Sequence, residues 1–425
     1  MSLKLRLVVM NFLQFYIWGA WLLTIGTWWF QTRQWSGTSF GAIFSTMGIA
    51  SLFMPSLAGI VADKWLNAER LYGLLQIAGA GVLFALPFAA TPEQMFWLML
   101  LNMCCYMPTI SLSIAVAYNA LKRDGLDVVS AFPPIRVWGT LGFIAATWTT
   151  SLLGFKASPA QFHVAAGASL LLGLYAFSLP ACPPSRSARQ GSLVERLGLT
   201  SFVLFKNRNM AVFFLFAMLL GAALQLTNAY GDAFLSDFVK VPAYASLPTV
   251  KYSTIIISIS QFSETAFILT IPFFLKRFGI KAVMTMSMLA WVLRFGLFGF
   301  GNPAGGLWMI VLSCIIYGMA FDFFNISGSL FVESQADPAI RASAQGLFML
   351  MTTGIGAVLG SLVAGFVIDR FFTSHQCDDA VAICKDWPGI WLAFAAYALV
   401  MAALFVPLFK HRHDPAAARR ALPTH

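Results

Sequence analysis

The sequence predicts an all-α membrane protein with twelve transmembrane helices in two six-helix halves. Hydrophobic residues make up 59% of the 425 positions, charged residues only 10%, and the mean hydropathy is +0.76. Soluble globular domains are about 45–50% apolar and about 25% charged, so this composition excludes a soluble protein. Apolar runs of about 20 residues, long enough to cross a bilayer as helices, recur along the whole chain.

The apolar runs define the predicted spans and the division between the halves. The spans lie approximately at 5–30, 39–62, 69–91, 94–118, 131–155, 159–182, 209–236, 250–275, 279–301, 305–332, 340–370 and 387–409. The longest interior connection is basic and contains Pro and Ser, and it separates six spans from six. We therefore predict an N-terminal half at 1–182, a cytoplasmic linker at 183–208, a C-terminal half at 209–410 and a cytoplasmic tail at 411–425.

The placement of Lys and Arg predicts the orientation in the membrane. Of the 27 basic residues, nineteen lie on the side of the two termini and six on the opposite side, while Arg136 and Arg294 fall within spans. Basic residues are enriched in cytoplasmic loops, so both termini are predicted to be cytoplasmic. The net charge of +10 thus reflects topology and does not indicate nucleic-acid binding. We interpret Arg294 as a structural residue that reaches the interface by snorkelling.

One short loop indicates the fold. The segment "GIVADKW", residues 59–65, has a glycine followed four residues later by the acid Asp63 and the base Lys64. This pattern resembles the loop signature of the major facilitator superfamily. The corresponding loop of the second half, "FLKRFGIK", keeps the basic residues and the glycine but lacks the acid. Transporters built from two such halves usually hold their substrate near the bilayer midplane.

The six cysteines fall into two groups. Four lie in or at the ends of spans, where we interpret them as small apolar fillers: Cys104, Cys105, Cys182 and Cys314. Cys377 and Cys384 share the loop "CDDAVAIC", which the topology places outside. An oxidising compartment permits a disulfide there, and two free thiols remain the alternative.

Two acids lie near the middle of predicted spans. A charged side chain at mid-bilayer costs about 2.5–3.5 kcal/mol on insertion scales, so such groups usually face a cavity or a partner. Glu264 lies about 13 residues into its span, which is about 20 Å along the helix, and Gln261 shares its face. Asp322 is the second mid-span acid. For both acids a functional role is favoured over a structural one.

Polar and aromatic residues form further stripes at helical spacing. One stripe is Gln225, Asn228 and Asp232, a second is Tyr317, Phe321 and Phe324, and a third is Arg136, Thr140 and Phe143. Amides often serve as interhelical hydrogen-bonding groups, and in a chain with 40 Phe an aromatic stripe is usually packing, so the structural reading stays open. Amides, aromatic faces and a carboxylate together suit a flat heterocycle attached to a diol-bearing sugar. A sugar alone also fits.

Longer strings carry a more specific resemblance. The segments "FPPIRVWGT", "MLLGAALQLTN", "ISISQFSETAFILTIPFFL", "YGMAFDFFNISGS" and "AIRASAQG" resemble the bacterial nucleoside:proton symporter family of the major facilitator superfamily. The likeness runs from about Leu3 to the twelfth span. It implies a substrate-binding set made of Arg136, Thr140, Phe143, Gln225, Asn228, Gln261, Glu264, Tyr317 and Phe321. We predict Asp322 as the proton carrier, with Glu264 as the rival.

The prediction from the sequence is a proton-coupled nucleoside importer that works by alternating access across the bacterial inner membrane. Its expected partners are a nucleoside of the uridine, adenosine or xanthosine type, protons and the lipid bilayer, with no nucleic acid, and we expect a monomer. The alternatives are a sugar:proton symporter, a drug exporter of the same fold, or a sensor that binds a nucleoside without moving it. No phosphate-binding loop, nucleophile motif or His-rich cluster is visible, so we expect no enzyme activity, cofactor or metal.

Overall fold

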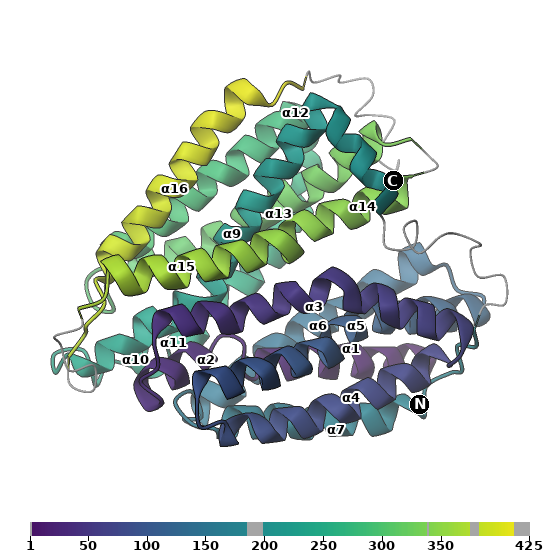
Figure 1. Ribbon diagram of the computed structural model, residues 1–425, viewed down its shortest axis with the longest axis horizontal. Coiled ribbons are helices and arrows are strands. Elements are labelled where there is room, and N and C mark those ends of the chain that lie inside the picture. Colours follow the sequence, from purple (N-terminus) through teal and green to yellow (C-terminus); the bar gives the residue numbers. More distant parts are fainter. Residues whose placement is uncertain (1, 185–198, 338–339, 375–381, 412–425) are drawn as a thin grey trace. The chain divides into compact units, whose positions relative to one another are not determined.

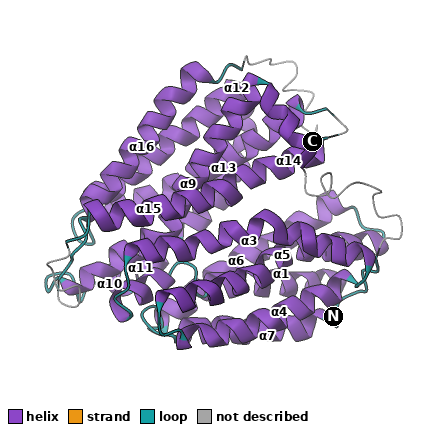
Figure 2. Cartoon of the chain, in the orientation of Figure 1, coloured by secondary structure: helices purple, strands orange, loops and turns teal. Residues whose placement is uncertain are grey.

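The computed structural model describes residues 2–184, 199–337, 340–374 and 382–411. These ranges are built from helices joined by short loops (Figures 1 and 2). Within them the structure has no strand, and an isolated bridge joins Thr373 to Lys385. Cys384 is disulfide-bonded, whereas Cys377 lies outside the described residues.

The chain forms two compact units. Unit 1 comprises Met1–Ser192 and Asn228–Ala233, and unit 2 comprises Leu193–Thr227 and Phe234–His425. The helices of the N-terminal segment are α1 (Leu3–Gly19), α2 (Ile25–Thr27), η1 (Trp28–Thr32), α3 (Gly37–Lys64), α4 (Ala68–Ala85), η2 (Leu86–Phe88), α5 (Pro92–Arg123), α6 (Val128–Leu152) and α7 (Ala160–Ala176). In unit 1, α1 packs against α6, α3 against α5, and α4 against α7 (Figure 1).

A buried polar network ties three helices of unit 1 together. Gln14 of α1 is fully buried, and its Oε1 accepts hydrogen bonds from Tyr72 and Gln76 of α4 at 2.7 and 2.8 Å. Its Nε2 donates to the hydroxyl of Thr109 on α5 at 2.8 Å. A membrane interior offers no water to satisfy such groups, so a satisfied network holds its helices in one arrangement. We interpret this network as structural.

The helices that follow the predicted linker carry the two acids. They are η3 (Leu199–Lys206), α9 (Arg208–Asp237), η4 (Phe238–Lys240), α10 (Pro248–Lys251), α11 (Ser253–Ile257), α12 (Ile259–Phe300), α13 (Leu307–Gln335), α14 (Arg341–Met349), η5 (Leu350–Gly356), α15 (Ala357–Phe371) and α16 (Trp387–Leu408). In unit 2, both α13 and α16 pack against α12.

Helix α12 changes direction at a glycine. The helical stretch Ser253–Phe300 has 48 residues, about 72 Å at 1.5 Å per residue, which is more than twice the roughly 30 Å of a bilayer core. Gly279 inside it has φ 79° and ψ 168°, a conformation that residues with a side chain rarely adopt. The stretch therefore accommodates two of the predicted spans, with the turn at Gly279.

Eight helices of the described residues are long and apolar enough to cross a membrane. The stretch with the Gly279 turn is one of them, and the apolar helix α7 is shorter. The number of twelve spans and the bounds of the two halves stay predictions.

A buried ion pair stabilises the end of α9. The Lys240 ammonium lies 2.9 Å from one carboxylate oxygen of Asp237, and the indole of Trp387 donates to the other oxygen at 2.9 Å. The side chains of Asp237 and Lys240 are both buried. The pair therefore connects the end of α9 to the start of α16.

We expect Asp237→Ala to lower the free energy of unfolding by about 3–5 kcal/mol, because the substitution removes the carboxylate from a buried ammonium and a buried indole N–H. Thermal unfolding of the purified protein measures the loss. The matched control is Glu333→Ala, which removes a largely exposed partner of Arg341 at 3.3 Å and should cost less than about 1 kcal/mol. Equal losses for the two variants would contradict this assignment.

Candidate functional site

Glu264 lies where α12 and α13 cross closely. The hydroxyl of Ser263 donates to the carbonyl oxygen of Ile315, and it accepts a hydrogen bond from the amide of Gly318 at 3.2 Å. A Cβ atom on Gly318 would lie 2.5 Å from the carbonyl oxygen of Ser263. The crossing therefore requires glycine at this position, and it brings Glu264 next to the segment of α13 that contains Tyr317.

We expect Gly318→Ala to destabilise the protein by about 1–3 kcal/mol, because the added methyl group forces α12 away from α13. Thermal unfolding is the measurement, and weaker ligand binding should accompany it because Glu264 moves with α12. Gly296→Ala on α12 is the control, since a Cβ there meets no atom within 4 Å. If the two variants unfold at the same temperature, the close crossing does not contribute to stability.

The two predicted proton carriers lie in one cluster. Tyr317 and Phe321 of α13 stack with ring centroids 6.0 Å apart and planes 9° apart. Tyr317 lies within electrostatic reach of both Glu264 and Asp322, and the two acids interact with each other. Asp322 is 4% exposed, and its Oδ2 has no hydrogen-bond partner among the described residues. The fold thus brings together two acids that are 58 positions apart in the sequence.

The predicted amides keep unused hydrogen-bonding capacity. Gln225 of α9 is buried and Gln261 of α12 is half-buried. In the described part of the chain the Oε1 atoms of both residues have no hydrogen-bond partner. Asn228, three residues beyond Gln225, is half-buried. Buried acceptors without partners are costly, and the N–H or O–H groups of a ligand can satisfy them.

The remaining predicted residues lie on α6 of unit 1. The guanidinium of Arg136 lies over the ring of Phe15, 4.1 Å from its centroid. Phe143 is buried and Thr140 is half-buried. These three residues follow one face of α6 at spacings of four and three, as the sequence predicts.

A small cavity in unit 2 adjoins Phe321. Its volume is about 110 Å³, and its lining consists of Leu220, Gly221, Leu224, Trp291, Ala320, Phe321, Phe324, Asn325, Met349, Thr352 and Thr353. Sites that enclose a whole small molecule measure roughly 300–1,000 Å³, so this cavity accommodates only part of one.

Sequence reasoning missed most of the residues that line this cavity. Thr352 and Thr353 lie on η5, which is π-helical, and π-helical turns are frequent at functional sites. The run "TTGIG" inside a predicted span was an available signal, because threonines and glycines together disturb regular helix geometry.

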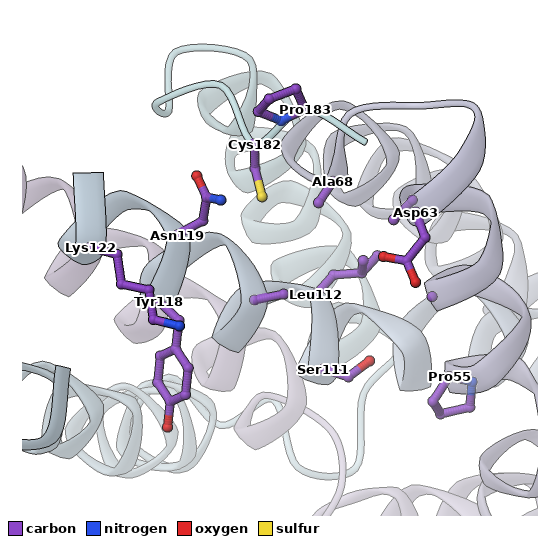
Figure 3. Close-up of a pocket in the computed structure, with 13 residues that line it drawn as sticks. Pro55, Asp63, Ala68, Ser111, Leu112, Tyr118, Asn119, Lys122, Cys182 and Pro183 are labelled. Atoms are coloured by element: carbon purple, nitrogen blue, oxygen red, sulfur yellow. The ribbon is translucent and has the colours of Figure 1, made fainter. Parts of the chain in front are cut away.

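A larger pocket of about 430 Å³ lies entirely in unit 1. Figure 3 shows Asp63 on one side of it and Asn119 and Lys122 on the other. Asp63 belongs to the loop motif, whereas none of the predicted substrate residues lines this pocket. Among the described residues, no group of three or more His, Cys, Asp or Glu side chains could hold a metal ion.

One interpretation from the sequence is wrong. Arg294 does not reach the interface, because its side chain is 0% exposed inside unit 2. Its Nη1 donates to the carbonyl oxygen of Ser313 at 2.7 Å, and its guanidinium lies 4.5 Å from the centroid of the Tyr317 ring. Hydrogen-bond and ring partners from three helices outweigh the tendency of a long basic side chain to extend to water.

Comparison with known proteins decides the family. Residues 1–414 match the model of the nucleoside H⁺ symporter family. The chain belongs to this family. A xanthosine permease of Escherichia coli (strain K12) is 52% identical over 426 residues, which is 100% of both chains. The nucleoside permease NupG of the same organism is 49% identical over 414 residues, 97% of each chain.

The structural comparison agrees with this assignment. A crystal structure of the nucleoside transporter NupG superposes with a TM-score of 0.90 and covers 97% of this chain and 100% of that one. The predicted fold class, an all-α membrane protein of the major facilitator superfamily, is confirmed. This nucleoside H⁺ symporter is a multi-pass transporter and not an enzyme.

Proposed function

We propose that this symporter imports nucleosides together with protons by alternating access across the bacterial inner membrane. The observation that carries the proposal is the match of residues 1–414 to the nucleoside H⁺ symporter family. Two relatives at about half identity, named as permeases for xanthosine and for nucleosides, support it. The bias of basic residues toward the side of the termini supports cytoplasmic ends, and we propose that the monomer is the working form.

We assign the ribose hydroxyls to Glu264, because a carboxylate accepts two hydroxyl hydrogens at once. The amides Gln225, Asn228 and Gln261 are assigned to the edges of the base or the sugar. The Oε1 atoms of Gln225 and Gln261, which have no hydrogen-bond partner among the described residues, support this role. The aromatic residues Phe143, Tyr317 and Phe321 are assigned to stacking and gating.

The residues of α6 complete the proposed set. Arg136 contributes a positive charge that balances an acid of the site, and Thr140 offers a hydroxyl group. We propose that these α6 residues belong to the substrate-binding set.

Asp322 is the proposed proton carrier. A buried carboxylate is costly, so protonation removes a charge that otherwise opposes closure around the substrate. The second acid in the same cluster raises that cost, because two like charges disfavour each other. Closure then proceeds when both the proton and the nucleoside are bound.

Uptake of radiolabelled uridine by cells that express the protein tests the substrate class. Excess nucleosides should abolish this uptake and excess hexoses should leave it unchanged. Uptake that excess hexoses abolish and excess nucleosides leave unchanged would indicate a sugar:proton symporter. Counterflow in liposomes separates a transporter from a sensor, because a protein that binds without moving its ligand gives no counterflow.

A further inference from the structure

Arg294 is a charged residue in the interior of unit 2. Its Nη1 donates to the carbonyl oxygen of Ser313 at 2.7 Å and lies 3.5 Å from the hydroxyl of Ser260, and its Nε lies 3.4 Å from the hydroxyl of Thr227. These contacts come from α13, α12 and α9. Three helices therefore meet at one guanidinium.

The contacts of Arg294 leave its charge without a paired anion. In the described ranges, no carboxylate lies within 4.0 Å of the guanidinium, and its Nη2 has no hydrogen-bond partner. The oxygens of Ser313, Ser260 and Thr227 that accept its hydrogen bonds are neutral. Apolar residues of similar volume usually fill such a site at equal or lower free energy. Packing alone therefore does not account for an arginine here.

The guanidinium contacts the aromatic part of the proposed substrate site. It lies 4.5 Å from the centroid of the Tyr317 ring and 5.1 Å from that of Phe298. Tyr317 in turn stacks on Phe321, and Trp291 meets the Tyr317 ring edge-on at 6.1 Å. A cation over a ring in a desolvated site is a strong orienting contact. Arg294 therefore restricts the position of the ring that we assign to stacking.

Tyr317 connects the charge of Arg294 with the acid cluster. Tyr317 is within electrostatic reach of Arg294, Glu264 and Asp322 together. The titratable groups that act on the guanidinium are Cys314 and Tyr317 of α13, and Tyr317 in turn interacts with Glu264 of α12 and Asp322 of α13, while the α9 contact of the guanidinium is the neutral Thr227. Two acids thus share a low-dielectric interior with one fixed positive charge.

We propose that Arg294 is a positioning residue of the transport site, which holds the Tyr317–Phe321 pair in place and balances the charge of Glu264 and Asp322 as protons bind and leave. The inference rests on the proposed function, since it concerns the same site. It assigns the coupling between protonation and substrate binding to a residue that touches neither substrate nor proton.

Two substitutions separate the two roles. Arg294→Gln removes the charge, so the acids hold their proton more tightly, and the midpoint of the pH profile of uridine transport should move to higher pH by about one unit. Arg294→Lys keeps the charge but lacks the planar fork, so the midpoint should stay in place while the Kd for uridine rises on the order of tenfold. Arg277→Gln, an exposed arginine of α12, is the control.

The measurements are uridine binding to purified protein and counterflow in liposomes across a pH series. The inference is overturned if Arg294→Gln leaves the midpoint of the pH profile of uridine transport unchanged, or if Arg294→Lys leaves the Kd for uridine unchanged. If Arg294→Gln does not yield folded protein, Arg294→Lys decides, because a lower melting temperature with an unchanged Kd would show a structural role alone. Failure of the proposed function looks different, since the unsubstituted protein would then not transport uridine.

Discussion

Replacing Asp322 with Asn is expected to abolish proton-driven accumulation of nucleosides and to leave nucleoside binding in place. Asparagine has nearly the shape of aspartate but cannot carry a proton, and the native carboxyl is 4% exposed beside Glu264. For one proton per nucleoside, a gradient of one pH unit supports about tenfold accumulation. The variant should therefore reach only an equal concentration on both sides.

Liposomes with an imposed pH gradient measure this accumulation, and counterflow without a gradient measures the binding and movement that the variant should retain. Asp124→Asn, an exposed acid at the end of α5, is the matched control. Unchanged accumulation by Asp322→Asn would remove Asp322 from the role of proton carrier. Glu264 would then be the remaining candidate of the cluster.

Glu264→Gln is expected to weaken uridine binding by about 10- to 150-fold, the equivalent of losing a hydrogen bond to a charged group. The amide keeps the volume of the carboxylate but replaces one acceptor oxygen by a donor, so it no longer accepts both ribose hydroxyls. Equilibrium binding to purified protein is the measurement. The same substitution should reduce the affinity for a 2′-deoxynucleoside less than the affinity for uridine, because a 2′-deoxynucleoside has only one of the two ribose hydroxyls.

The matched control for this substitution is Glu333→Gln, an exposed glutamate of α13. It should bind uridine like the unsubstituted protein. A Glu264→Gln variant with normal affinity would show that the ribose is recognised by other groups. The predicted amides Gln225, Asn228 and Gln261 would be the next residues to test.

Several features of the fold followed from local sequence. The composition predicted a helical membrane protein, and hydropathy placed a boundary between the spans at 250–275 and 279–301, where the structure has the turn at Gly279. Helical spacing also placed Arg136, Thr140 and Phe143 along one face of α6. These predictions succeed because hydropathy and periodicity depend on residues within a few turns of each other.

The same reasoning did not find the environment of Arg294 or the lining of the cavity beside Phe321. Hydropathy treats an arginine near a span end as free to reach water, whereas the hydrogen bonds that this guanidinium donates to Ser313, Ser260 and Thr227 hold it inside. These partners lie 19 to 67 positions away. No local pattern identifies them.

The sequence by itself determined that the chain is a helical membrane protein, which of its residues are costly in lipid, and which family it resembles. Only the tertiary structure decided which of the residues that are costly in lipid lie next to each other. The crossing at Ser263 and Gly318, 55 positions apart, brings Glu264 toward Asp322 because a glycine admits the neighbouring backbone. Local forces shape each helix, but the contact between two distant helices depends on the fit of both surfaces.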